Sequence, residues 1–313
     1  MRALLFPGQG SQVVGMGLEL FNNFSKVKQI FKEADDRLSY PLSKIILEGP
    51  EEKLQLTENT QPAILTVSYS YIKVLKEEFD LNLRLFNYFA GHSLGEYSAL
   101  VSANSLKFSD AIFLLNERGK AMQNSVPVGK GSMIAVLGTQ IDEITKLINN
   151  RKNNGGVCEI ANDNANGQVI VSGDKESVML FQSELKENKI KCIPLKVSAP
   201  FHCSMMKSAA NNMQKKIEDT KFKEPEIEII SNVTTRPEKN PEKIKKLLIE
   251  QIFSTVRWRE SILNMHEKGI SNFVEIGPGK VLSGMVKRTI KDANCFSINS
   301  ITDIKNLIDE LKK

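Results

Sequence analysis

The sequence predicts an α/β fold in which a parallel sheet is interrupted by a small β-α-β-β-α-β unit. Short apolar segments that end in glycine alternate with amphipathic helical stretches along most of the chain. That alternation is typical of a parallel sheet covered by helices. Between residues 128 and 197 the order of strands and helices changes to the ferredoxin-like arrangement. The length of 313 residues fits one large domain or two modest ones.

The large domain is expected at residues 1–127 and 198–313. Its first strand starts at Arg2 (RALLFPG), and a second spans Leu85–Ala90. Helical patterns reach to about residue 80 and run again from Glu96 to Asn124. After the insert, the expected elements are a strand in IEIISNV (227–233), helices over Lys243–Gln251 and Trp258–Lys268, and a closing strand in NFVEIGPG (272–279).

The insert is expected at residues 128–197 as a ferredoxin-like unit. A cleft between it and the large domain is the natural place for a substrate. Its expected elements are the strands SMIAVLG (132–138), GVCEIAND (156–163), QVIVSG (168–173) and KCIPLKV (191–197), and the helices IDEITKLINN (141–150) and ESVMLFQSELKENK (176–189).

Composition excludes several classes of protein. No apolar run approaches the roughly 20 residues of a membrane helix, and the first residues do not form a secretory signal, so a cytoplasmic protein is expected. The formal net charge is +5, but the lysines are scattered among acidic residues, which argues against a nucleic-acid surface. The cysteines and histidines have no metal-ligand spacing and no disulfide framework is indicated. They are Cys158, Cys192, Cys203, Cys295, His92, His202 and His266.

The sharpest local signal is the segment GHSLG at residues 91–95, which matches G-x-S-x-G. An apolar segment precedes it and a helical stretch follows, as in a nucleophile elbow. There Ser93 stands at a helix N-terminus, where free N–H groups favour developing negative charge. The alternative is that Ser93 only caps the helix.

A serine nucleophile needs a base, and the chain has three histidines. His92 adjoins Ser93 and is expected to pack or to form a hydrogen bond, because consecutive side chains in an elbow diverge. His266 lies near the end of a charged helix and is expected to be exposed. His202 can enter the cleft and is the candidate base, with a structural histidine as the alternative. No acidic residue stands out as its partner, so a backbone or amide oxygen is expected there.

Arg118 lies on the apolar stripe of a predicted helix. A buried guanidinium needs an anionic partner. The residues leave two partners open: an internal carboxylate such as that of Glu96, or a substrate carboxylate held by the planar fork. The apolar residues on the same face are Ala111, Leu114, Leu115 and Met122.

The glycine-rich segment GQGSQ (8–12) does not fit a phosphate-binding loop. The dinucleotide fingerprint would need glycine at Val13, and the P-loop spacing has Met16 in place of lysine. A strand-to-helix turn with free N–H groups remains, which suits an oxyanion hole.

Ten segments in order resemble the malonyl-CoA:acyl carrier protein transacylase family, and the resemblance extends over essentially the whole chain. They are FPGQGSQ (6–12), TQPAIL (60–65), GHSLGEYSAL (91–100), LLNERGKAM (114–122), GKGSMIAVLG (129–138), QVIVSG (168–173), SAPFHCSMM (198–206), SNVT (231–234), QIFSTVRW (251–258) and VEIGPGKVLSG (274–284).

The resemblance implies an α/β-hydrolase-like large domain with the ferredoxin-like insert. It also implies that Ser93 accepts the acyl group and that His202 is its base. A backbone carbonyl near Gln251 would orient the imidazole, and the backbone N–H groups of Gln9 and Leu94 would form the oxyanion hole.

For substrates, the resemblance implies that malonyl groups pass from malonyl-CoA to the phosphopantetheine thiol of acyl carrier protein, in fatty-acid synthesis and without a metal or other cofactor. Arg118 would hold the malonyl carboxylate. Acyl carrier proteins are strongly acidic, so a mildly basic surface suits this partner. No nucleic-acid or membrane partner is expected, and a monomer is the default.

Two other functions stay open on the residues alone: a serine esterase or thioesterase of the α/β-hydrolase type, and a non-catalytic acyl-carrier-binding protein. The sequence also departs from the family pattern at two places. The segment NDNANGQ (162–168) lacks a proline that is frequent in that loop, and Cys203 follows His202 where serine is also common, which adds a candidate reactive thiol.

Overall fold

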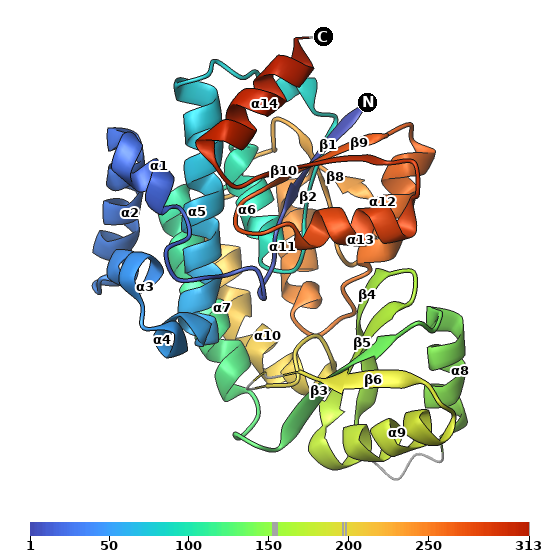
Figure 1. Cartoon of the computed structure of the whole chain (residues 1–313). Coiled ribbons are helices and arrows are strands. Elements are labelled where there is room, and N and C mark those ends of the chain that lie inside the picture. Colours follow the sequence, from blue (N-terminus) through green and yellow to red (C-terminus); the bar gives the residue numbers. More distant parts are fainter. Residues whose placement is uncertain (152–155, 196, 198, 313) are drawn as a thin grey trace.

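Two separate sheets organise the protein, which is described here from a computed structural model covering residues 1–151, 156–195, 197 and 199–312 (Figure 1). The larger sheet has six strands in the order β10-β9-β1-β2-β7-β8, and all neighbours are parallel except β7 and β8. Its strands are β1 (Arg2–Phe6), β2 (Tyr88–Gly91), β7 (Glu228–Ile230), β8 (Pro237–Glu238), β9 (Asn272–Ile276) and β10 (Asn294–Ile298).

Helices cover both faces of this sheet, as expected for buried parallel strands. Alternate residues of β1 point to opposite faces. Leu4 and Phe6 pack in one hydrophobic cluster with α5, α6, α7 and α10, whereas Ala3 and Leu5 pack in another with α12 and α13. The helices are α1 (Leu18–Asn23), α2 (Ser25–Leu38), α3 (Leu42–Glu48), α4 (Glu51–Gln55), α5 (Thr57–Glu77), α6 (Gly95–Ser102), α7 (Phe108–Asn124), α10 (Lys207–Asp219), α11 (Pro241–Gln251), α12 (Trp258–Glu267), α13 (Val281–Thr289) and α14 (Ile301–Leu311), with short 3-10 turns at Leu83–Leu85 and Ser204–Met206.

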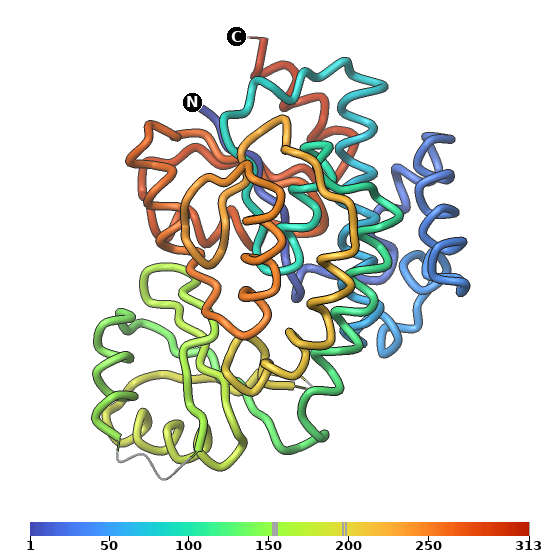
Figure 2. The backbone as a smooth tube through the Cα atoms, turned by 180° about the vertical axis from the view of Figure 1, so that it is seen from behind, coloured from blue at the N-terminus to red at the C-terminus, as the bar shows by residue number. Residues whose placement is uncertain are grey.

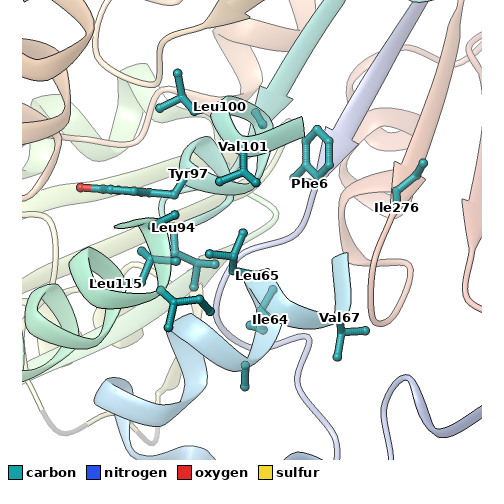
Figure 3. Close-up of a cluster of buried hydrophobic side chains, with 14 of the residues drawn as sticks. Phe6, Ile64, Leu65, Val67, Leu94, Tyr97, Leu100, Val101, Leu115 and Ile276 are labelled. Carbon is teal, nitrogen blue, oxygen red and sulfur yellow. The ribbon is translucent and has the colours of Figure 1, made fainter. Parts of the chain in front are cut away.

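The first cluster fixes helix α6, which begins directly after the G-x-S-x-G segment. Figure 3 shows Leu94 and Tyr97 packed beside Leu65 of α5 and Leu115 of α7. Tyr97 is fully buried, as are Leu65 and Leu115. Because both ends of this short helix lie in a dense core, the turn before it has little freedom.

The smaller sheet is antiparallel, with the order β4-β5-β3-β6. This is the predicted β-α-β-β-α-β connection, and α8 and α9 share a hydrophobic cluster with its strands. Figure 2 shows this segment at one end of the molecule and both termini at the other. The elements are β3 (Gly131–Leu137), α8 (Ile141–Asn150), β4 (Cys158–Ala165), β5 (Gln168–Asp174), α9 (Lys175–Glu187) and β6 (Lys191–Pro194).

The predicted α/β class and the ferredoxin-like order are therefore confirmed. The domain limits at 127/128 and 197/198 stay a prediction, and residues 196 and 198 beside the second limit lie outside the described part of the chain.

The structure differs from the sequence-based expectations at the second strand and at the end of the chain, and it adds detail at two other places. The second strand begins at Tyr88 and not at Leu85, because Asn82 caps a 3-10 turn that includes Leu85. The helical run from Glu96 is two helices, α6 and α7, separated by a turn in which Asn104 has a φ of 57°. The strand at Asn272 does not close the fold, because α13, β10 and α14 follow it. The short strand β8 was not expected.

Candidate active site

The site lies at the carboxyl edge of the parallel sheet, where β1 and β2 end side by side. Phe6 pairs with Gly91 in the register of these strands. The loop after β1 and the elbow after β2 therefore leave the sheet at the same place. Asn232, from the segment after β7, and Asn162 and Asn164, from the insert, also lie at that edge. Ligand sites in α/β folds are usually found there.

Ser93 occupies a sharp turn between β2 and α6, with a φ of 53°. A residue other than glycine rarely adopts this conformation, and it is characteristic of a nucleophile elbow. The turn requires its two glycines. A Cβ atom on Gly91 would lie 1.8 Å from the carbonyl carbon of Gly95, and a Cβ on Gly95 would lie 2.3 Å from the backbone oxygen of Phe6.

His202 stands next to Ser93, with Nε2 at 2.8 Å from the serine Oγ. Its Nδ1 lies 2.9 Å from the backbone oxygen of Gln251, at the end of α11. Because a carbonyl oxygen only accepts, Nδ1 carries the proton and Nε2 is free to accept one from the serine. Burial, followed by the charge of Arg118, lowers the pKa of His202 to about 3, so the free imidazole is neutral at pH 7.

Arg118 reaches the same point from α7 and is 1% exposed. Its Nη2 donates to Ser93 Oγ at 3.1 Å and to the side-chain oxygen of Gln251 at 2.9 Å, while Nη1 donates to the side-chain oxygen of Gln61 at 2.8 Å. Within the described residues its Nε has no hydrogen-bond partner and its guanidinium forms no ion pair. A direct ion pair with Glu96, one of the two partners left open by the sequence, is absent.

Two residues whose backbone N–H groups were expected to form the oxyanion hole border this site. Gln9 lies in the turn after β1, and Leu94 follows the elbow serine; both line the same cavity as Ser93 and His202. Among the described residues, neither N–H group has an acceptor. Their role as the oxyanion hole stays a prediction.

A cavity of about 210 Å³ opens at these groups. Its polar wall includes Gln61, His92 and Arg118, and Asn162 and Asn164 come to it from β4 of the insert. Its apolar wall includes Met122, Met133, Ile170, Leu195, Val197 and Phe201. The cavity thus lies between the two sheets, where the sequence predicted a cleft.

The other two histidines lie outside the Ser93–His202 pair. His92 bonds through Nε2 to Asn164 at 2.9 Å and packs edge-on against Trp258, which confirms the expected packing or hydrogen-bonding role. His266 is half-buried, with Nδ1 at 3.1 Å from the backbone oxygen of Ile270, so the expectation that it is exposed was wrong.

Cys203 is not the reactive thiol that the sequence suggested. It is buried, its Sγ lies 3.1 Å from the backbone oxygen of Pro200, and burial raises the pKa of the thiol to about 11. The thiol therefore stays protonated at neutral pH and is a poor nucleophile.

Sequence reasoning missed a buried polar layer behind the elbow. Asn232, two residues after the end of β7, accepts from the Ser93 N–H at 2.7 Å and donates to the backbone oxygen of Gly91 at 2.8 Å. The side-chain nitrogen of Gln251 donates to the backbone oxygen of Ser93 at 3.0 Å and to Glu96. An asparagine at the carboxyl end of an expected parallel strand was the available signal for Asn232.

Within the described residues, no three His, Cys, Asp or Glu side chains are grouped so that they could hold a metal ion. Among the helices of the described chain, none is both long and apolar enough to cross a membrane.

An elbow serine paired with a buried histidine, at the carboxyl edge of a parallel sheet, defines a class of α/β enzymes that act on acyl groups. Comparison with known proteins narrows this class. Residues 3–310 match the acyl transferase domain family. The chain belongs to this family and is an acyltransferase.

The curated relatives include the malonyl CoA-acyl carrier protein transacylase of Bacillus subtilis, which is 41% identical over 99% of this chain and 97% of that protein. Among solved structures, the acyl-carrier-protein-S-malonyltransferase of Bartonella henselae is 40% identical, with a TM-score of 0.95 over 100% of this chain and 99% of that one. A malonyl-transacylase solved in complex with a type II PKS acyl-carrier protein is 37% identical, with a TM-score of 0.94 over 99% of both chains.

Proposed function

We propose that this acyltransferase moves the malonyl group of malonyl-CoA to the phosphopantetheine thiol of acyl carrier protein through a malonyl-Ser93 ester, and that it supplies fatty-acid synthesis. The names of the relatives support the substrates. The observation that carries the proposal within the site is Arg118, a buried cation beside Ser93 that forms no ion pair among the described residues.

In the first half-reaction, Ser93 Oγ attacks the thioester carbonyl while His202 Nε2 takes its proton. The carbon–oxygen bond forms and the carbonyl oxygen becomes an oxyanion. The N–H groups of Gln9 and Leu94 hold this oxyanion, and each is expected to contribute about 3 kcal/mol of transition-state stabilisation. The C–S bond then breaks, and CoA leaves as a thiol with the proton from His202.

In the second half-reaction, the carrier thiol enters the cavity and gives its proton to His202. Its sulfur attacks the malonyl ester, the same N–H groups hold the second oxyanion, and Ser93 recovers its proton as the ester bond breaks. The two steps form a ping-pong reaction.

Arg118 accounts for selection of a dicarboxylic acyl unit. Its planar fork can meet a carboxylate with two parallel hydrogen bonds. Bound there, the distal carboxylate of a malonyl group would sit beside Ser93, as attack on the thioester requires. An acetyl group offers nothing to this cation and leaves it buried and unpaired.

The face of α13 next to the cavity fits an acidic carrier. Val281, Leu282 and Met285 of this helix line the cavity. Lys287 and Arg288, in its last turn, are exposed, and neither forms an ion pair within the described part of the chain. A positive surface beside the cavity mouth would steer an acidic protein towards it.

The proposal involves no resident cofactor, because every step is assigned to groups of this chain and its two substrates. A monomer is proposed because those groups come from one chain. The cytoplasm is proposed because Cys158, Cys192, Cys203 and Cys295 are all free thiols, as expected in a reducing compartment.

The test is the intact mass of the protein after mixing with malonyl-CoA, with and without acyl carrier protein. We expect a mass increase of one malonyl group, its absence in Ser93→Ala, and its loss when the carrier is added, with malonyl recovered on the carrier. Full turnover of malonyl-CoA to free malonate without the carrier would identify a thioesterase. No mass increase, together with an unchanged carrier affinity in Ser93→Ala, would identify a carrier-binding protein without this activity.

A further inference from the structure

Glu96 is a buried carboxyl group that the proposed reaction does not use. It lies on α6, three residues after the elbow serine, and is 4% exposed. Its Oε2 accepts a short hydrogen bond from the side-chain nitrogen of Gln251 and a second from the backbone N–H of Asn232 at 3.3 Å. It therefore belongs to the polar layer behind the elbow.

Gln251 joins this carboxyl group to Arg118. One end of its side-chain amide donates to Glu96, and the other accepts from Arg118 Nη2 at 2.9 Å. The guanidinium and the carboxyl group are thus linked through one amide and do not touch. Because a direct ion pair would occupy the guanidinium, the amide bridge keeps Arg118 open towards the cavity while placing an ionisable acid behind it.

The charges around Glu96 are few. The positive charge of Arg118, on α7, favours the ionised form of Glu96. The hydroxyl of Tyr97, on the same helix as Glu96, interacts electrostatically with both Glu96 and Arg118. The groups facing it from α11 and from the loop after β7 are the neutral Gln251 and Asn232. His202 lies on the far side of Gln251 and is neutral at pH 7. Glu96 is accordingly the one carboxyl group, within the described chain, that interacts with Arg118.

Burial raises the pKa of Glu96 to about 8, against the lowering effects of its two hydrogen bonds and of Arg118. Near pH 8 the acid therefore gains or loses its proton readily. A substrate carboxylate on Arg118 would add a second negative charge nearby and oppose the ionisation of Glu96.

We propose that Glu96 is a positioning residue that supplies the counter-charge of Arg118 only in its ionised form, and that it takes up a proton when an anionic acyl group binds. The inference rests on the proposed function, in which Arg118 takes the malonyl carboxylate. Glu96 and the substrate then compete for one cation. The affinity for malonyl-CoA falls as Glu96 ionises, whereas an acyl group without a carboxylate is indifferent to it.

The test is the KM of the acylation step for malonyl-CoA between pH 6.5 and 9.5, in the wild type and in Glu96→Gln. Glutamine keeps an oxygen that accepts from Gln251 but cannot ionise. We expect the wild-type KM to rise about fivefold or more across pH 8, in the usual range of coupling between charged sites, and the variant to stay flat. Glu117→Gln is the matched control, because Glu117 precedes Arg118 on α7 but pairs with Lys120 and Lys216 outside the site; its profile should follow the wild type.

A second measurement needs no variant. In the wild type, the ratio of the KM values for malonyl-CoA and acetyl-CoA should rise through pH 8. A constant ratio, or a Glu96→Gln profile that rises as the wild type does, overturns the role of Glu96 while leaving the proposed function intact. If malonyl-CoA forms no acyl-enzyme at any pH, the proposed function itself fails.

Discussion

The backbone oxygen of Gln251 lies 2.9 Å from Nδ1 of His202, in the place that an aspartate takes in a serine hydrolase triad. A carbonyl oxygen fixes the tautomer and the direction of the ring, but it carries no full negative charge. The imidazole is therefore oriented without being made strongly basic. This agrees with the low pKa of His202, which burial and the nearby Arg118 both depress.

This low pKa predicts how stability depends on pH. The folded-state pKa of His202 is about 3, below its ordinary value of 6.5, so the unfolded chain binds more protons between these two values. The contribution of His202 to the free energy of unfolding is present above pH 6.5 and is lost as the pH falls towards 3. Urea unfolding at pH 6.5 and pH 5 should show this loss, and His202→Asn, which keeps a donor for the Gln251 oxygen, should show a smaller one. Equal losses in both proteins would mean that the imidazole is not held neutral by the fold.

The elbow glycines give a prediction about packing. Gly91→Ala places a Cβ atom 1.8 Å from the carbonyl carbon of Gly95, which no side-chain movement relieves. We expect the free energy of unfolding to fall by about 3 kcal/mol or more, as in severe overpacking. Gly284→Ala is the control, because it lies on α13 with no atom within 4 Å of the new Cβ. That change should be neutral or should stabilise by up to about 1 kcal/mol. Similar losses in urea unfolding for both variants would contradict the packing argument.

Much of the site was predictable because its residues lie in local motifs. The segment around Ser93 predicts a strand, a turn and a helix. The helical spacing around Arg118 predicts that this side chain lies on a buried face. The structure agrees with both. The fold class followed in the same way from the alternation of strands and helices.

The contacts between distant segments could not be predicted in this way. A hydrophobic pattern shows which face of a helix is buried, but not which helix it meets. The meeting of Gln251, Glu96 and Asn232 depends on how α11, α6 and the end of β7 pack together. The sequence indicated Glu96 only as a possible direct partner of Arg118 and Gln251 only through a backbone carbonyl, and it gave no contact among the three side chains. The end of the chain was missed for a related reason, since β10 is only half-buried and its strand pattern is weak.

Replacement of Arg118 should change acyl selectivity. Arg118→Ala removes the group assigned to the malonyl carboxylate, and we expect kcat/KM for malonyl-CoA to fall about 100-fold or more, since truncating one partner of a buried charged pair costs about 2–5 kcal/mol. Acetyl-CoA should gain relative to malonyl-CoA, because the unpaired buried cation is gone. Rapid-quench measurements of acylation with both thioesters give the ratio of kcat/KM for malonyl-CoA to that for acetyl-CoA. Arg84→Ala, at an exposed position, is the control. An unchanged ratio would show that the arginine has only a structural role.

The two cations at the end of α13, Lys287 and Arg288, should matter for transfer to the carrier but not for acylation by malonyl-CoA. Lys287→Glu with Arg288→Glu reverses two exposed charges in the last turn of α13, the helix whose earlier residues line the cavity, and an acidic carrier should dock less well. We expect the KM for acyl carrier protein to rise about tenfold, equivalent to about 1.4 kcal/mol, and to become less sensitive to salt. Acylation by malonyl-CoA should keep its KM, because the carrier takes no part in that step. Lys305→Glu with Lys312→Glu, at two exposed lysines of α14 and its C-terminal cap, makes the same change in net charge and is the control. If the KM for malonyl-CoA rises as much as that for the carrier, these cations serve the phosphates of CoA and the carrier docks elsewhere.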